Sequence, residues 1–208
     1  MKSIYTLFLL FIFSLSRQHL TASDNKLKTF CQLSRPEKCW VLTHPFIANK
    51  ARKITEHVRT VTNDITKSTE LDGDPDGGQV DAFRHSYWMA CLSKKMRSKK
   101  ALRLGKAHEK GNYLSFKKGK HEDGALPDSI ASVMDLYNNQ LGIEIAQKNK
   151  DTDLDSLQTL LILAIRNGDA KMILKNGNKE FLDCDRNLLK MTDFKGQWNI
   201  PKCLIPSN

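Results

Sequence analysis

Apolar residues recur at helical spacing along most of the chain. One stripe of Ala48, Ile54, Val58 and Val61 begins just after Pro45, a residue that fits the first turn of a helix. The same spacing recurs in four later segments. We therefore expect five helices, covering residues 45 to about 66, 79 to 96, 99 to 113, 128 to 148 and 154 to 167. Asp128 can cap the fourth of these helices, and Gly168 follows the fifth.

Beyond residue 168 the pattern changes from helical to extended. The triplets 172–174 and 180–182 are mostly apolar, and they flank a turn that contains Asn176-Gly177. An Asn-Gly pair between two short apolar runs is typical of a β-hairpin. The sequence thus predicts a mainly α fold, roughly a five-helix bundle with a small C-terminal β-hairpin, and we expect Trp198 to hold the tail against the bundle.

The first residues are typical of an export signal. Lys2 supplies a positive start, residues 4–15 are apolar, and small residues occur up to Ser23. We expect residues 1–23 to be a signal peptide, with a retained anchor as the alternative, and the mature chain to have no transmembrane segment. The protein would then be periplasmic or extracellular. The remaining divisions are a lead-in at 24–43, a helical domain at 44–168 and a cysteine-stapled tail at 169–208.

Export to an oxidising compartment favours disulfide formation among the five cysteines. Cys91 lies in a helical stretch, where a buried thiol behaves as a small hydrophobic group, so we expect it to stay free. The simplest pairing of the other four is Cys31 with Cys39 and Cys184 with Cys203. No Cys-x-x-Cys pair supports a zinc finger or a thioredoxin-like site.

The composition is that of one folded, basic domain. Hydrophobic residues make up 40% and charged residues 27%, with 33 Lys+Arg against 23 Asp+Glu and a formal net charge of +10. Disordered and fibrous classes are thereby excluded. Lysine clusters at 94–95, 99–100 and 117–120 could attract an anionic envelope polymer or lipid headgroups. No basic strand with interleaved aromatic residues is present, so we predict no specific nucleic acid as a partner.

Polar side chains occupy inward-facing positions on three of the expected helices. Asp81 and His85 lie one turn apart on the second helix, with Arg84 beside them. His108 lies on the inward face of the third helix, in line with Ala101, Gly105 and Asn112, and Glu109 borders that face. The fourth helix presents Asp135, Asn138, Asn139 and Gly142. Buried without partners, such groups would cost roughly 1–3 kcal/mol each, so we expect them to share one site.

Three interpretations of this shared site remain open. His85, His108 and Asp135 could hold one divalent metal ion, with Glu109 as the base for a bound water. Alternatively, no metal is needed: His85, His108 or Glu109 transfers protons, Asp81 orients them, and Arg84, Asn138 and Asn139 bind the substrate. In the third interpretation, the same residues form a packing network with no chemistry.

Three segments of the chain stand out as motifs: Asp81-Ala82-Phe83-Arg84-His85-x-Tyr87-Trp88, Ala107-His108-Glu109 and Met134-Asp135-Leu136-x-Asn138-Asn139-x-x-Gly142. Together they resemble a bacterial family of helical domains of unassigned function, which occurs mainly at the C-termini of secreted wall-associated or toxin-type proteins. The resemblance covers about residues 76–147. It implies a helical domain of bacterial origin, and it makes the inward-facing polar residues shared features of the family without supplying a reaction.

Our hypothesis from the sequence is an exported hydrolase that acts on an anionic cell-envelope or phosphate-bearing substrate. The alternative is a non-catalytic, envelope-associated binding or structural module in which the same cluster only supports packing. A catalytic site must be reachable from solvent at His85 or His108, whereas a packing network would be sealed.

Overall fold

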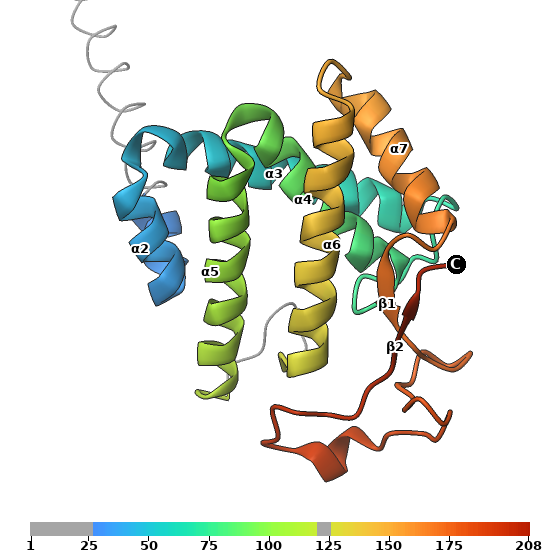
Figure 1. Cartoon of the computed structure of the whole chain (residues 1–208). Helices are drawn as coiled ribbons and strands as arrows, with labels where there is room; N and C mark the ends of the chain where they lie inside the picture. The colour runs from blue at the N-terminus through green and yellow to red at the C-terminus, as the bar shows by residue number, and fades with distance from the viewer. Residues whose placement is uncertain (1–26, 120–125) are drawn as a thin grey trace, which may run out of the picture.

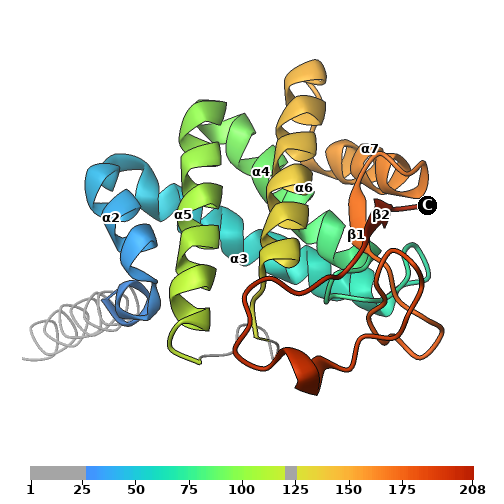
Figure 2. The ribbon, with the colours of Figure 1, turned by 60° about the horizontal axis from the view of Figure 1, so that its bottom comes forward.

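The computed structural model describes residues 27–119 and 126–208, and the predicted signal peptide at 1–23 lies outside these ranges. The helices are α2 (Arg35–Thr43), α3 (Pro45–Lys67), α4 (Gln79–Lys95), α5 (Ser98–Phe116), α6 (Ser129–Lys148) and α7 (Leu154–Arg166). In both views α5 and α6 stand side by side in front of α3 and α4 (Figures 1 and 2). The mainly helical fold is confirmed, and the five predicted helices correspond to α3 to α7.

The predicted count of five helices is wrong, because α2 lies in the predicted lead-in at 24–43. Ser34 caps this helix: its hydroxyl accepts from the backbone N–H of Glu37, and Glu37 accepts from the backbone N–H of Ser34. Trp40 anchors the helix by burying its ring and donating its indole N–H to the Lys100 carbonyl at 3.1 Å. The lead-in is thus part of the packed fold.

Helix α4 lies at the centre of the molecule, in contact with α3, α5, α6, α7 and β1. Nearly all of its residues from Val80 to Leu92 are buried, because other elements pack around most of its circumference. The helix therefore has no broad polar face towards solvent. Its closest neighbour is α6, and a Cβ atom added to Gly142 would lie only 1.9 Å from the backbone oxygen of Ser86. Gly142 therefore sets how closely the two helices cross.

The strand pairing differs from the predicted hairpin. Strand β1 (Lys171–Ile173) pairs antiparallel with β2 (Leu204–Pro206), with Ile173 opposite Leu204. The segment expected to be the second strand makes only isolated bridges, one of them between Lys175 and Phe181. The Asn176 side chain accepts from two backbone N–H groups of its turn, which closes a wider loop than a two-residue hairpin allows.

The tail from β1 to the C-terminus is fastened in several places. One disulfide joins Cys184 to Cys203, as expected. The short 3₁₀ helix η1 (Met191–Phe194) precedes Trp198, whose ring packs against those of Tyr113 and Phe116 at the end of α5. These contacts agree with the expected role of Trp198 in holding the tail.

The other expected disulfide is not formed: Cys31 and Cys39 are exposed free thiols, and Cys91 is buried and free as predicted. Cys31 precedes the Ser34 cap, whereas Cys39 lies within α2, so the capped turn separates them. The predicted pairing rested only on the oxidising compartment and on the closeness of the two cysteines in sequence, and it did not consider this turn.

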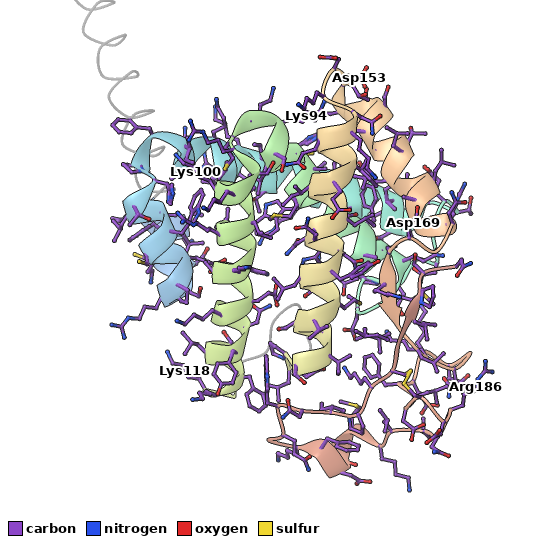
Figure 3. The ribbon with its side chains drawn as sticks, viewed as in Figure 1. Lys94, Lys100, Lys118, Asp153, Asp169 and Arg186 are labelled. Atoms are coloured by element: carbon purple, nitrogen blue, oxygen red, sulfur yellow. A yellow bond between two sulfur atoms is a disulfide. The ribbon has the colours of Figure 1, made fainter. Side chains whose placement is uncertain are left out.

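One predicted basic cluster has a structural use. Lys94, at the end of α4, donates to the carbonyls of Asn149, Lys150 and Thr152 at 2.6–2.7 Å (Figure 3). It thereby closes the connection between α6 and α7 instead of facing an external anion. Among the described residues, no helix has the length and apolar character needed to cross a membrane.

Candidate active site between helices α4, α5 and α6

Asp81 and His85 enter the site from the first turns of α4. The loop before this helix folds back on it, and the Gly77 backbone N–H donates to Asp81 Oδ2 at 2.7 Å. This bond fixes the carboxylate at the positive end of the helix, where negative charge is favoured. Because one turn separates the two residues, Asp81 Oδ1 lies 3.4 Å from His85 Nε2.

Asp135 reaches the same imidazole from α6. Its Oδ1 atom lies 3.4 Å from His85 Nε2, and both carboxylates and the imidazole are buried. One possible ligand atom from each of Asp81, His85 and Asp135 lies within 4.8 Å of the others. The structure therefore brings together two of the three predicted metal ligands, His85 and Asp135, and adds Asp81 to them.

Arg84 supplies a positive charge at the edge of this cluster. Its Nη2 atom lies 2.7 Å from Asp81 Oδ1 and 3.3 Å from His85 Nε2, and 28% of its side chain is exposed. Arg84 therefore contacts the buried carboxylate of Asp81 at one end while part of its side chain is exposed to solvent.

Burial lowers the pKa of His85 well below its ordinary value, and the charges of Arg84 and His108 lower it further. The amide of Asn139 adjoins the imidazole and opposes this effect. His85 is consequently neutral near pH 7, and one of its ring nitrogens keeps a lone pair.

His108 lies beside this cluster, and its hydrogen-bond partner is Glu37 of α2, which is not among the predicted site residues. Its Nδ1 atom is 3.1 Å from Glu37 Oε1, and its ring centroid is 6.3 Å from that of His85. The ring of Trp88 packs against that of His108 in a T-shaped arrangement, with 5.6 Å between the ring centroids. With 26% of its side chain exposed, His108 is the more accessible of the two imidazoles.

Glu37 is held ionised in this arrangement. Burial raises its pKa, but the hydrogen bond and charge of His108 outweigh that effect, and with the bonds from Ser34 they lower the pKa to about 2. Glu37 is not among the site residues that the sequence pattern predicts. The available signal was the Ser34-x-x-Glu37 capping pattern, which could have predicted the helix but not its contact with His108.

The remaining predicted residues, Asn138, Glu109 and Asn139, have three different surroundings. Asn138 is tied to the backbone of Lys171, donating to its carbonyl and accepting from its N–H, each at 2.9 Å, so it anchors β1. Glu109 is buried on α5 and accepts from Asn112 at 3.3 Å. Asn139 is fully buried next to Gly105 of α5, whose lack of a side chain leaves room for its amide.

Comparison with known proteins identifies one family. A family model described as "Domain of unknown function (DUF6973)" matches residues 38–169. No curated protein and no solved structure gives a match. The matched range includes Asp81, His85, His108 and Asp135, whereas Glu37 lies one residue before it.

Proposed function

The chain belongs to this DUF6973 family, and from the geometry of its polar cluster we propose that it is a hydrolase of anionic, phosphate-bearing or cell-envelope substrates. The observation that carries the proposal is the Glu37–His108 pair, which lies partly open to solvent beside the buried Asp81–His85–Asp135 cluster. An ionised carboxylate that orients an accessible imidazole is a recurrent arrangement for general-base catalysis.

The roles of the residues follow from this geometry. When the His108 imidazole is neutral, Glu37 accepts from its Nδ1–H, and Nε2 then carries the lone pair that a general base needs. Nε2 takes a proton from a water molecule as the water oxygen bonds to the phosphorus or acyl carbon of the substrate. The bond to the leaving oxygen breaks, and His108 returns the proton to that oxygen. Arg84, partly exposed beside the cluster, binds the anionic group and stabilises its developing charge.

The proposed setting is outside the cytoplasm of a bacterium. It rests on the signal-like pattern of residues 1–23 and on the resemblance to secreted bacterial proteins. The net charge of +10 favours anionic polymers or lipid headgroups as the substrate-bearing surface.

Replacement of His108 tests the proposal directly. The mature chain would be assayed on aryl phosphate mono- and diesters and on vesicles of anionic phospholipid. Because the base is removed, we expect His108→Gln to lower kcat/KM by about 10²–10⁴-fold on the substrate that the native protein cleaves, with little change in Tm. His57→Gln is the matched control, because His57 is exposed on α3 and contacts Tyr87 outside the cluster.

Two results would refute the hydrolase. One is a native protein that cleaves no member of the panel, and the other is unchanged cleavage by His108→Gln. The burial of His85 and the Arg84–Asp81 ion pair favour a second candidate, a non-catalytic module in which the cluster supports packing. That candidate predicts a large loss of Tm in His108→Gln and no hydrolysis by the native protein.

A further inference from the structure

Two distances from His85 Nε2 match the spacing of ligands around a small divalent cation, and the three possible ligand atoms all lie within 4.8 Å of one another. Nε2 lies 3.4 Å from one oxygen of Asp81 and 3.4 Å from one oxygen of Asp135. Ligands about 2.1 Å from a tetrahedral metal ion lie about 3.4 Å from one another. The three side chains come from two helices whose separation Gly142 sets, so this spacing is built into the fold.

A second observation concerns the other side of the imidazole. The Asn139 side chain is fully buried, and neither its Nδ2 nor its Oδ1 makes a well-aligned hydrogen bond with the described residues. Its amide nevertheless lies next to His85, whose Nδ1 is likewise buried without a well-aligned partner. An amide oxygen that faces Nδ1–H places the lone pair on Nε2, between the two carboxylates. A metal ligand needs this tautomer, and a neighbouring acceptor commonly fixes it in this way.

A lone pair directed at two carboxylate oxygens is repulsive unless a cation lies among them. In the structure Arg84 Nη2 approaches that position, since it contacts both Asp81 Oδ1 and His85 Nε2. The guanidinium is partly exposed and can turn towards solvent. A divalent ion would therefore take the position that Arg84 Nη2 now occupies beside Asp81 and His85. The displaced guanidinium would then be free to bind the substrate.

From these contacts we propose that Asp81, His85 and Asp135 bind one Zn²⁺ or Mn²⁺ ion, with coordination positions left open for water or substrate. One imidazole and two carboxylates suit these ions, and three protein ligands with an open position are typical of catalytic centres. The inference deepens the proposed function and depends on it only for the ion's catalytic role, because ion binding can be measured without any hydrolysis. His108, one of the three ligands predicted from the sequence, is not a ligand in this proposal and stays with Glu37 as the base.

The test is titration of the chelator-treated protein with Zn²⁺ or Mn²⁺ by calorimetry, with the bound metal counted by elemental analysis. We expect one ion per chain, and at least a tenfold weaker affinity in Asp135→Asn and His85→Gln. Asp76→Asn is the matched control, because Asp76 is an exposed carboxylate in the loop that precedes α4. The ion affinity of this variant should equal that of the native protein. Absence of one-to-one binding, or loss of binding in Asp76→Asn alone, would overturn the proposal.

Arg84→Gln guards against variants that merely fail to fold. Removal of the competing guanidinium should tighten ion binding several-fold, a gain that a damaged protein cannot produce. Unchanged or weaker binding in a folded Arg84→Gln protein would contradict the proposed competition.

His108→Gln separates this inference from the hydrolase itself. If both hold, the variant binds the ion normally and loses hydrolysis. A native protein that binds the ion but cleaves nothing refutes the hydrolase and keeps the metal site. A native protein that hydrolyses equally well with and without chelator, and binds no ion, refutes the metal site and keeps the hydrolase.

Discussion

At the scale of single residues, Glu37 connects the start of a helix to the proposed chemistry. Its Oε2 accepts from the Ser34 backbone N–H at 2.8 Å, and its Oε1 faces His108 at 3.1 Å. Gly111 of α5 allows this approach, because a Cβ there would lie 2.5 Å from the Ser34 hydroxyl. The capping box of α2 thus also orients the imidazole of α5.

The pKa of Glu37 predicts a defined pH dependence of stability. Because its pKa in the folded chain is about 2, below the ordinary 4.5, its contribution to the free energy of unfolding is fully present above pH 4.5. It is lost as the pH falls from 4.5 towards 2. The full contribution is about 3 kcal/mol.

Urea unfolding of the native chain and Glu37→Gln from pH 7 to pH 3 measures this contribution. We expect the native chain to be more stable at pH 7 and the difference to shrink below pH 4.5. A difference that stays constant over this range would show that the ionised carboxylate is not its source.

At the scale of helices, the crossing of α4 and α6 decides whether the site exists. Gly142 meets the backbone of Ser86, and two turns earlier on α6 Asp135 faces His85. If the two helices separated, Asp135 would leave the imidazole, so the packing and the proposed ion site depend on the same contact.

Gly142→Ala tests this dependence. Alanine favours an isolated helix by about 1 kcal/mol, but here its Cβ would overlap the Ser86 carbonyl and push the helices apart. We expect a net loss of about 2 kcal/mol in the free energy of unfolding, together with weaker Zn²⁺ binding. Gly177→Ala is the control, because nothing lies within 4 Å of a Cβ there. Equal stability of the two variants would contradict the close crossing.

At the scale of the whole molecule, the C-terminal tail returns to the helical body and closes it. The Ser207 hydroxyl donates to the Ile165 carbonyl of α7 at 2.6 Å, and β2 pairs with β1. Lys202 forms a buried ion pair at 2.7 Å with Asp128, the residue that caps α6. The tail therefore contacts the helices that carry the site.

The Cys184–Cys203 disulfide should stabilise this closure. It joins residues 19 positions apart. A crosslink of this length restricts the unfolded chain, and the lost entropy raises the free energy of unfolding by about 3 kcal/mol at 25 °C. The double variant Cys184→Ser, Cys203→Ser should lose stability of that order in chemical denaturation. Reducing agent should destabilise the native chain to a similar extent and leave the double variant unchanged; equal effects on both would contradict this role.

Thiol labelling at pH 8 checks the state of the other cysteines. Cys31 and Cys39 are exposed and should react in the native protein. Burial raises the pKa of Cys91 to about 12, although Tyr87 and Lys95 oppose the shift, so Cys91 should react only after unfolding. A native protein in which neither Cys31 nor Cys39 reacts would restore the disulfide that the sequence alone suggested.

The sequence by itself determined the five longer helices and the inward phase of Asp81, His85, His108 and Asp135. These features depend on a local period of about 3.6 residues, which can be recognised within one helical segment without knowledge of the others. The short helix α2 was not predicted, because its sequence has a capping box and one buried tryptophan but no long apolar stripe.

Only the tertiary structure decided which of these residues meet. In the fold, Asp81 lies beside His85 and Asp135, and His108 contacts Glu37. Asn138 binds the backbone of β1, and β1 pairs with the strand near the end of the chain. Each of these contacts except the Asp81–His85 pair links separate elements. Such contacts depend on how the helices rotate and cross, which here follows from small residues at their contacts, and no local pattern specifies that geometry.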